Sequence, residues 1–127
     1  MICGSTTDAA LISRWTFDGN TNDAVGGRNG TLLGDAQYSA NVPAGFGGSS
    51  LALDGTLDKM IVDVTGADQI GGVFTVAAWV NLAESRPDGT LTYFGTRFPD
   101  GNGFDFKSRL AGNSAIRVDL GDGKQAD

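Results

Sequence analysis

The segment Asp18-Gly19-Asn20-Thr21-Asn22-Asp23 carries the side-chain types best suited to holding a hard cation. Oxygen-bearing side chains recur there at positions i, i+2, i+4 and i+5, and Ca²⁺ takes about six to eight oxygen ligands from such curled loops. The pattern predicts that oxygens of Asp18, Asn20, Asn22 and Asp23 could surround a calcium ion. The alternative is that these side chains cap turns by bonding to nearby backbone, and the residues leave both interpretations open.

The sequence contains few of the residue types that most enzymes use for catalysis. The chain has no histidine, which removes Ser-His-Asp and Cys-His catalysis, and Cys3 is the only cysteine, which removes intrachain disulfides and cysteine zinc sites. A glycosidase needs two carboxyl groups about 5–9.5 Å apart. Glu84 is the only glutamate, and the aspartates fall mainly in turn-like sequence. We predict that the chain is not an enzyme; part of a glycoside-active enzyme is the less favoured alternative.

Aromatic and polar residues in the second half could bind sugar, because C–H faces stack on rings while polar groups bond to hydroxyls. The candidates are Trp79, Tyr93, Arg97 and Phe98. Packing in a protein core is the alternative for Trp79, as it is for Trp15.

Asn29-Gly30-Thr31 is a formal acceptor for N-linked glycosylation. The same Asn-Gly pair predicts a tight turn.

The charge pattern bears on possible partners. The formal net charge is −6 at pH 7 and no cluster of Lys and Arg is present, which argues against nucleic acid as a partner. No run of about 18 apolar residues predicts a membrane span. Met1–Cys3 is too short for the apolar region of a signal peptide, so we expect no signal peptide in this chain.

The elements that must position these residues are predicted to be strands. Twenty glycines, abundant aspartate and 40% apolar residues fit many short strands joined by tight turns. Alternation predicts strands at Ile12–Phe17, Met60–Val64, Phe74–Leu82, Leu91–Gly95, Phe104–Leu110 and Ala115–Leu120, with short apolar runs at Leu32-Leu33 and Leu51–Leu53. Asp-Gly or Asn-Gly turns are predicted at Asp18, Asn29, Asp54, Asp88, Asp100 and Asp122.

Two predicted strands carry most of the fold information. Trp15 and Phe17 share one face of the opening strand and are expected to point inward. Phe74–Leu82 is apolar on both faces, which predicts either a central strand covered on each side or a strand that lines a concave surface. We predict an all-β fold, an antiparallel β-sandwich or jelly roll of about eight to ten strands. Residues 1–10 form a polar lead-in, and residues 11–127 form a single domain.

The order of these motifs resembles the laminin G-like jelly roll of the concanavalin A-like lectin/glucanase superfamily. That pattern runs from Trp-x-Phe-Asp through an Asp with glycines and a Gly-Thr to a Gly-x-Ala-Leu strand and a Phe-Thr-Val-x-x-Trp-Val strand. The chain contains Trp15-Thr16-Phe17-Asp18, Asp23 with Gly26 and Gly27, Gly30-Thr31, Ser50-Leu51-Ala52-Leu53-Asp54-Gly55 and Phe74-Thr75-Val76-Ala77-Ala78-Trp79-Val80. The resemblance covers roughly Leu11–Leu120. The Trp-His pair and Tyr-x-Asp-Gly strand of the family's second half are absent, so the domain is expected to be incomplete at its C-terminal end.

The resemblance implies a noncatalytic binding or adhesion module with an extracellular or cell-surface location. It also implies a structural Ca²⁺ near Asp18, Asn20 and Asp23. The expected partners are carbohydrate or a protein surface. The alternative is a structural, self-associating domain: the Asp122-Gly123 turn is followed by only four residues, so a partner strand could come from a second copy, giving a homodimer.

Overall fold

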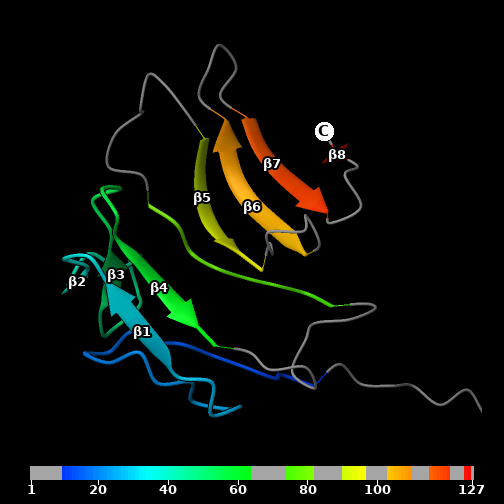
Figure 1. The fold of residues 1–127 in the computed structure, drawn as a ribbon. Coiled ribbons are helices and arrows are strands. Elements are labelled where there is room, and N and C mark those ends of the chain that lie inside the picture. Colours follow the sequence, from blue (N-terminus) through cyan, green and yellow to red (C-terminus); the bar gives the residue numbers. More distant parts are fainter. Residues whose placement is uncertain are drawn as a thin grey trace, which may run out of the picture. The chain divides into compact units, whose positions relative to one another are not determined.

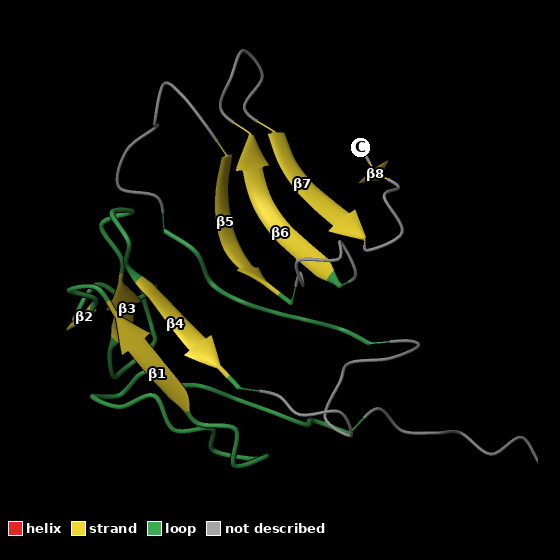
Figure 2. Cartoon of the chain, viewed as in Figure 1, coloured by secondary structure: helices red, strands yellow, loops and turns green. Residues whose placement is uncertain are grey.

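The computed structural model describes residues 10–63, 74–81, 90–96, 103–109, 115–120 and 125–126 (Figure 1). These ranges contain strands and no helix (Figure 2), and every strand pair in them is antiparallel. No helix in the described ranges is therefore long or apolar enough to cross a membrane. The all-β, antiparallel part of the prediction is confirmed. The sheets are small, and the jelly roll stays a prediction.

The chain separates into two compact units, Met1–Val76 and Ala77–Asp127. The first unit contains two nested antiparallel pairs. Strand β1 (Gly30–Leu33) pairs with β4 (Lys59–Val62), and β2 (Gln37–Ser39) pairs with β3 (Ser50–Ala52). Because β2 and β3 lie between β1 and β4 in the sequence, the chain runs out along one side and returns along the other.

The two pairs are offset where they meet. Three residues, 34–36, join β1 to β2, whereas six residues, 53–58, join β3 to β4 on the returning side. The register therefore changes from Leu33↔Lys59 to Gln37↔Ala52 across this point. Two connections of unequal length are held side by side there, and their backbone N–H groups need acceptors outside the ladder.

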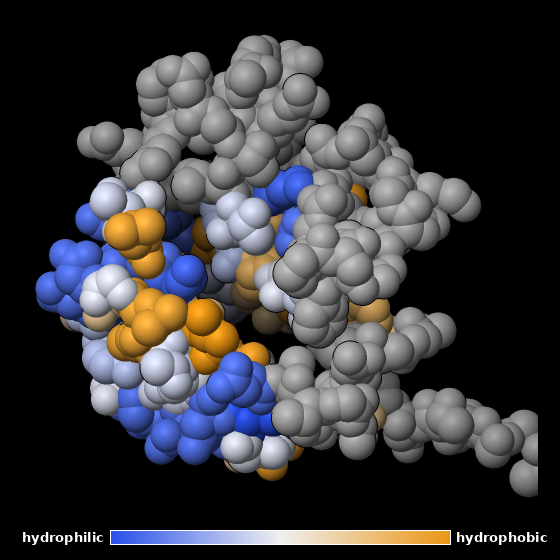
Figure 3. Space-filling model, viewed as in Figure 1, coloured by the Kyte–Doolittle hydropathy of each residue, from blue (hydrophilic) through white to orange (hydrophobic). Residues whose placement is uncertain are grey.

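Along both strands of the β1–β4 pair, exposed side chains alternate with half-buried ones. Leu33 and Ile61 are 39% and 42% exposed, whereas Leu32 and Met60, on the opposite side, are half-buried. Figure 3 shows apolar side chains gathered on the surface over this pair. The alternation that predicted strands at Leu32-Leu33 and Met60–Val64 is thus present, with β4 ending at Val62.

The opening segment is less regular than predicted. Ile12–Phe17 makes one isolated bridge, Trp15↔Asp23, instead of a strand, although Ser13, Trp15 and Phe17 are half-buried and their neighbours are exposed. The side chain of Asp23 is the physical reason. It accepts the N–H of Arg14, which a ladder would give to a partner carbonyl, and Phe17 has a positive φ of 59° that ends the extended backbone.

The second unit contains a four-stranded sheet in the order β5-β6-β7-β8. Its strands are β5 (Thr90–Gly95), β6 (Phe104–Arg109), β7 (Ala115–Leu120) and β8 (Gln125–Ala126). The register of β5 against β6 shifts between Thr92 and Phe94, which marks a bulge. The strands predicted at Leu91–Gly95, Phe104–Leu110 and Ala115–Leu120 are confirmed to within a residue.

The two faces of β6 differ in chemistry. Phe106 stacks on Phe94 with ring centroids 5.0 Å apart, and Tyr93 lies 6.0 Å from Phe106. On the other face Asp105 and Lys107 are 8% and 9% exposed, and their charged groups lie 3.7 Å apart. The ion pair offsets part of the cost of burying the two charges. The aromatic face is only half-buried.

The strand predicted at Phe74–Leu82 differs most from its prediction; the structure describes Phe74–Asn81 of it, and Leu82 lies outside the described residues. The segment lies outside every strand of the described residues, and each of its side chains is exposed. Among the side chains whose exposure the structure describes, no apolar one is buried, and the buried ones are Asp23, Asp105 and Lys107. High β propensity and apolar faces predict a strand only when a partner strand and a second layer are there to cover it.

Candidate functional site

Asp23 organises the loop between the opening segment and β1. Its Oδ1 accepts hydrogen bonds from the backbone N–H groups of Arg14 and Val25, both at 2.9 Å, and its Oδ2 accepts from the N–H of Arg28 at 3.1 Å. The side chain is only 7% exposed. A buried carboxylate that collects several backbone donors fixes the course of the chain around it.

Further hydrogen bonds close the same loop. The N–H of Asp23 donates to Asn29 Oδ1 at 3.0 Å, and the indole N–H of Trp15 donates to the carbonyl of Arg28 at 2.8 Å. Thr21 and Gly30 are joined twice, through the Thr21 hydroxyl and through the Gly30 N–H. The loop is therefore a hydrogen-bonded unit in which Trp15 has a structural partner.

Burial acts to raise the pKa of Asp23, but the hydrogen bonds to its carboxylate outweigh burial. The backbone N–H groups of Arg14, Val25 and Gly26, together with the Ser13 hydroxyl, lower the pKa below its ordinary value. The charged form is thus the one that the folded loop stabilises.

This shift predicts a loss of stability in acid. A depressed folded-state pKa contributes stability that is present above the unfolded pKa, about 3.9, and is lost as the pH falls from there toward the folded value. We expect the free energy of unfolding, measured in urea from pH 7 to pH 2, to fall below about pH 4. Asp23→Asn should flatten that fall by up to about 1.4 kcal/mol per pH unit, the slope of a single group. Parallel curves for the two proteins would contradict the assignment.

The other two predicted calcium ligands also bond to backbone. Asp18 Oδ1 accepts the N–H of Ser49 at 2.9 Å, and Asn20 Oδ1 accepts the N–H of Asn22 at 2.9 Å. Asp18 and Asn20 are exposed, whereas Asp23 is buried. Asn20 and Asp23 therefore make the turn-capping contacts of the alternative interpretation, whereas Asp18 bonds to backbone 31 residues away in the sequence. Calcium binding by Asp18, Asn20 and Asp23 stays a prediction, since an oxygen that accepts one hydrogen bond retains a lone pair.

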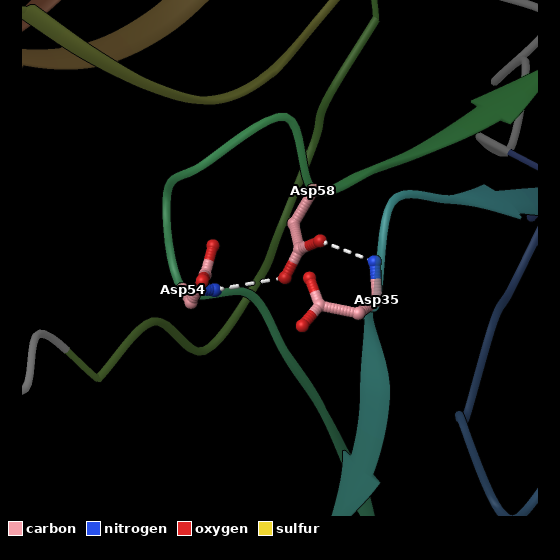
Figure 4. Close-up of side chains that lie close together, drawn as sticks. All are labelled: Asp35, Asp54 and Asp58. Atoms are coloured by element: carbon pink, nitrogen blue, oxygen red, sulfur yellow. Dashed lines mark hydrogen bonds between the residues drawn. The ribbon is translucent and has the colours of Figure 1, made fainter.

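A second acidic group lies where the connections β1–β2 and β3–β4 meet. Asp35 comes from the first connection and Asp54 and Asp58 from the second, and carboxylate oxygens of the three lie within 4.8 Å of one another (Figure 4). Asp58 holds the connections together, because its two oxygens accept the N–H of Asp35 at 2.8 Å and the N–H of Asp54 at 3.0 Å. We call Asp35, Asp54 and Asp58 the acidic cluster; it could hold an ion.

The charges of the acidic cluster are coupled. A hydrogen bond to Asp58, reinforced by the negative charge of Asp58, raises the pKa of Asp35. The N–H of Asp54 is the main cause that lowers the pKa of Asp58, with the Asp35 N–H adding to it. These opposite directions arise because the two carboxyl groups lie close together, so that ionisation of Asp58 disfavours ionisation of Asp35. A cation bound here would favour the ionised form of both groups.

The acidic cluster could not be found from the sequence by spacing alone. Asp54-Gly55, where a tight turn was predicted, lies in the connection between β3 and β4, two strands that pair with β2 and β1 and not with each other. Asp35, however, joins Asp58 only through the β1–β4 register, and Asp35 and Asp58 are 23 residues apart in the sequence.

The predicted sugar-binding side chains fall in different environments. Trp79 is 76% exposed within Phe74–Asn81. Tyr93 is half-buried and packs against Phe106. Arg97 and Phe98 lie outside the described residues. Of the candidates in the described ranges, Trp79 presents the larger aromatic surface to solvent.

Comparison with protein-family models, with curated proteins and with solved structures finds no match for this chain.

Proposed function

We propose that this chain is a noncatalytic binding module of the laminin G-like type, that it binds carbohydrate, and that Trp79 is its principal contact. The observation that carries the proposal is the 76% exposure of the Trp79 indole. An exposed indole offers a flat apolar surface to the C–H face of a sugar ring. Asn81, also exposed and two residues further on, supplies an amide that can bond to hydroxyl groups.

Several features of the sequence support this class. Without histidine, and with Glu84 as the only glutamate, the chain is poor in groups that transfer protons near neutral pH. The net charge of −6 suits a neutral polyol better than a polyanion. The resemblance to the laminin G-like jelly roll supports both sugar binding and an extracellular or cell-surface location.

The test is retention on insoluble polysaccharides, using chitin, xylan and a β-glucan as probes. We expect at least one to retain the chain, and Trp79→Ala to weaken that binding about tenfold, which corresponds to about 1.4 kcal/mol. Tyr38→Ala is the matched control, because Tyr38 is also an exposed aromatic, at 37%, but lies on β2. Undiminished retention of Trp79→Ala would refute the role of Trp79, and no retention on any polysaccharide would point to a protein ligand instead.

Calcium is the cation that we propose for this module, and the acidic cluster is its better candidate site. Three carboxylates within 4.8 Å can supply several of the oxygens that Ca²⁺ needs. In the opening loop, both oxygens of Asp23 already accept hydrogen bonds from backbone N–H groups.

We expect millimolar Ca²⁺ to raise the melting temperature above that in EDTA, since a ligand specific to the native state stabilises it by about 2.7 kcal/mol at a hundredfold excess over Kd. Asp35→Asn should abolish the calcium response, because it replaces a carboxylate ligand with a neutral amide. Asp18→Asn should leave the response intact. The opposite result would place the ion in the opening loop, and identical melts in Ca²⁺ and EDTA would remove both sites.

A second candidate function is self-association through Phe74–Asn81. Phe74, Val76 and Val80 are 41%, 42% and 45% exposed, and the segment has no charge that would repel an identical copy. A dimer in sedimentation equilibrium that Val76→Lys dissociates, without polysaccharide binding, would favour this function over sugar binding.

A further inference from the structure

We propose that Asn29 accepts an N-linked glycan when the chain passes through a secretory pathway that performs this modification. Asn29-Gly30-Thr31 is the only Asn-x-Ser/Thr sequence in the 127 residues. Asn29 directly precedes β1 and Thr31 lies within it, and both residues are exposed. The motif is thus displayed on the surface of the first unit.

The local geometry differs from the tight turn that Asn29-Gly30 predicts. Gly30 is the first residue of β1, and its N–H donates to the carbonyl of Thr21 at 2.8 Å. The positive φ in this region belongs to Gly27, at 72°. The acceptor sequence therefore enters a strand in extended form, with alternate side chains directed to opposite faces.

The side-chain amide of Asn29 is oriented for the modification. Its Oδ1 accepts the N–H of Asp23 at 3.0 Å, which fixes the carbonyl toward the loop. Within the described residues its Nδ2 donates to no protein atom. The nitrogen that receives a glycan is therefore the end of the amide that the loop does not use.

The reaction preserves the fold of the loop. Nδ2 attacks the anomeric carbon of an oligosaccharide carried on a lipid pyrophosphate; the bond from that carbon to the pyrophosphate oxygen breaks, and Nδ2 loses one proton. The product keeps the amide carbonyl, so the Asp23 N–H can still donate to Oδ1. Glycosylation therefore costs the loop no hydrogen bond.

The test is secretion of the chain, behind an added signal peptide, from cultured eukaryotic cells that also secrete a reporter glycoprotein. We expect a slower band that collapses when peptide N-glycosidase treats the native protein, and conversion of Asn29 to Asp in the peptide mass spectrum. Thr31→Val should abolish the slower band while keeping a β-branched residue in β1, and Thr31→Ser should retain it.

Two results would overturn the proposal. One is an unmodified, folded chain secreted beside a modified reporter. The other is a glycan that persists in Thr31→Val. The proposal rests on the extracellular location proposed above and on no ligand, so a failure to bind polysaccharide leaves it unaffected.

Discussion

Asp23→Ala is expected to lower the free energy of unfolding by about 2–4 kcal/mol, because three backbone N–H groups lose their acceptor and each unsatisfied buried donor costs about 1–3 kcal/mol. The donors are those of Arg14, Val25 and Arg28, and the carboxylate that they share is 7% exposed. Partial access of water to these N–H groups keeps the expected loss below the sum. Urea unfolding in a Trp79→Phe background, where Trp15 is the only indole, measures it directly.

Asp18→Ala is the matched control for this prediction. Asp18 is also a loop aspartate, but it is exposed, and within the described residues its side chain accepts one hydrogen bond, from the N–H of Ser49. Its removal should cost less than about 1 kcal/mol. Equal losses in the two variants would mean that Asp23 does not organise the loop.

Gly34→Ala is expected to destabilise the first unit by about 2–3 kcal/mol. Gly34 has a φ of 76°, which costs a residue with a Cβ roughly 1–2 kcal/mol. An added Cβ would also overlap Asp58 Oδ1 and lie 3.0 Å from Asp58 Cα, so the backbone of the other connection would have to move. The substitution should therefore disturb the acidic cluster and reduce any calcium response with it.

Gly27→Ala separates the cost of the positive φ from the cost of the steric overlap with Asp58. Gly27 has nearly the same φ, 72°, but an added Cβ there meets nothing within 4 Å. Its cost should be the backbone cost alone, about 1–2 kcal/mol. If thermal or urea unfolding gives the two alanine variants the same stability, the close approach of connections 34–36 and 53–58 is wrong.

The regular strands were the part of the fold most accessible to sequence reasoning. Phe104–Lys107 alternates aromatic and charged residues, so the period of two of this strand was plain. Which face of the strand is buried could not be predicted from this pattern, because the buried side chains are Asp105 and Lys107 rather than the phenylalanines. Alternation tells which residues share a face, and burial depends on what covers that face.

The loops were less predictable because side chains there replace backbone partners. Ile12–Phe17 has the alternation of a strand, yet the carboxylate of Asp23 takes the Arg14 N–H that pairing would use. Asp23 looked like a cation ligand for the same reason that it caps the loop: a carboxylate suits N–H groups and cations alike. Asp35 and Asp58 could be brought together only by the β1–β4 register.

The chain's two tryptophans provide the most direct test of the central proposal, that Trp79 contacts carbohydrate. Two indole N–H signals are expected in a ¹H–¹⁵N spectrum, and Trp15→Phe and Trp79→Phe assign them. Titration with soluble fragments of the retained polysaccharide should shift the Trp79 signal progressively and leave the Trp15 signal unchanged, since the Trp15 N–H is bonded to Arg28 within the loop. A Trp79 signal that stays in place while the polysaccharide binds, or a shift confined to Trp15, would contradict the proposal.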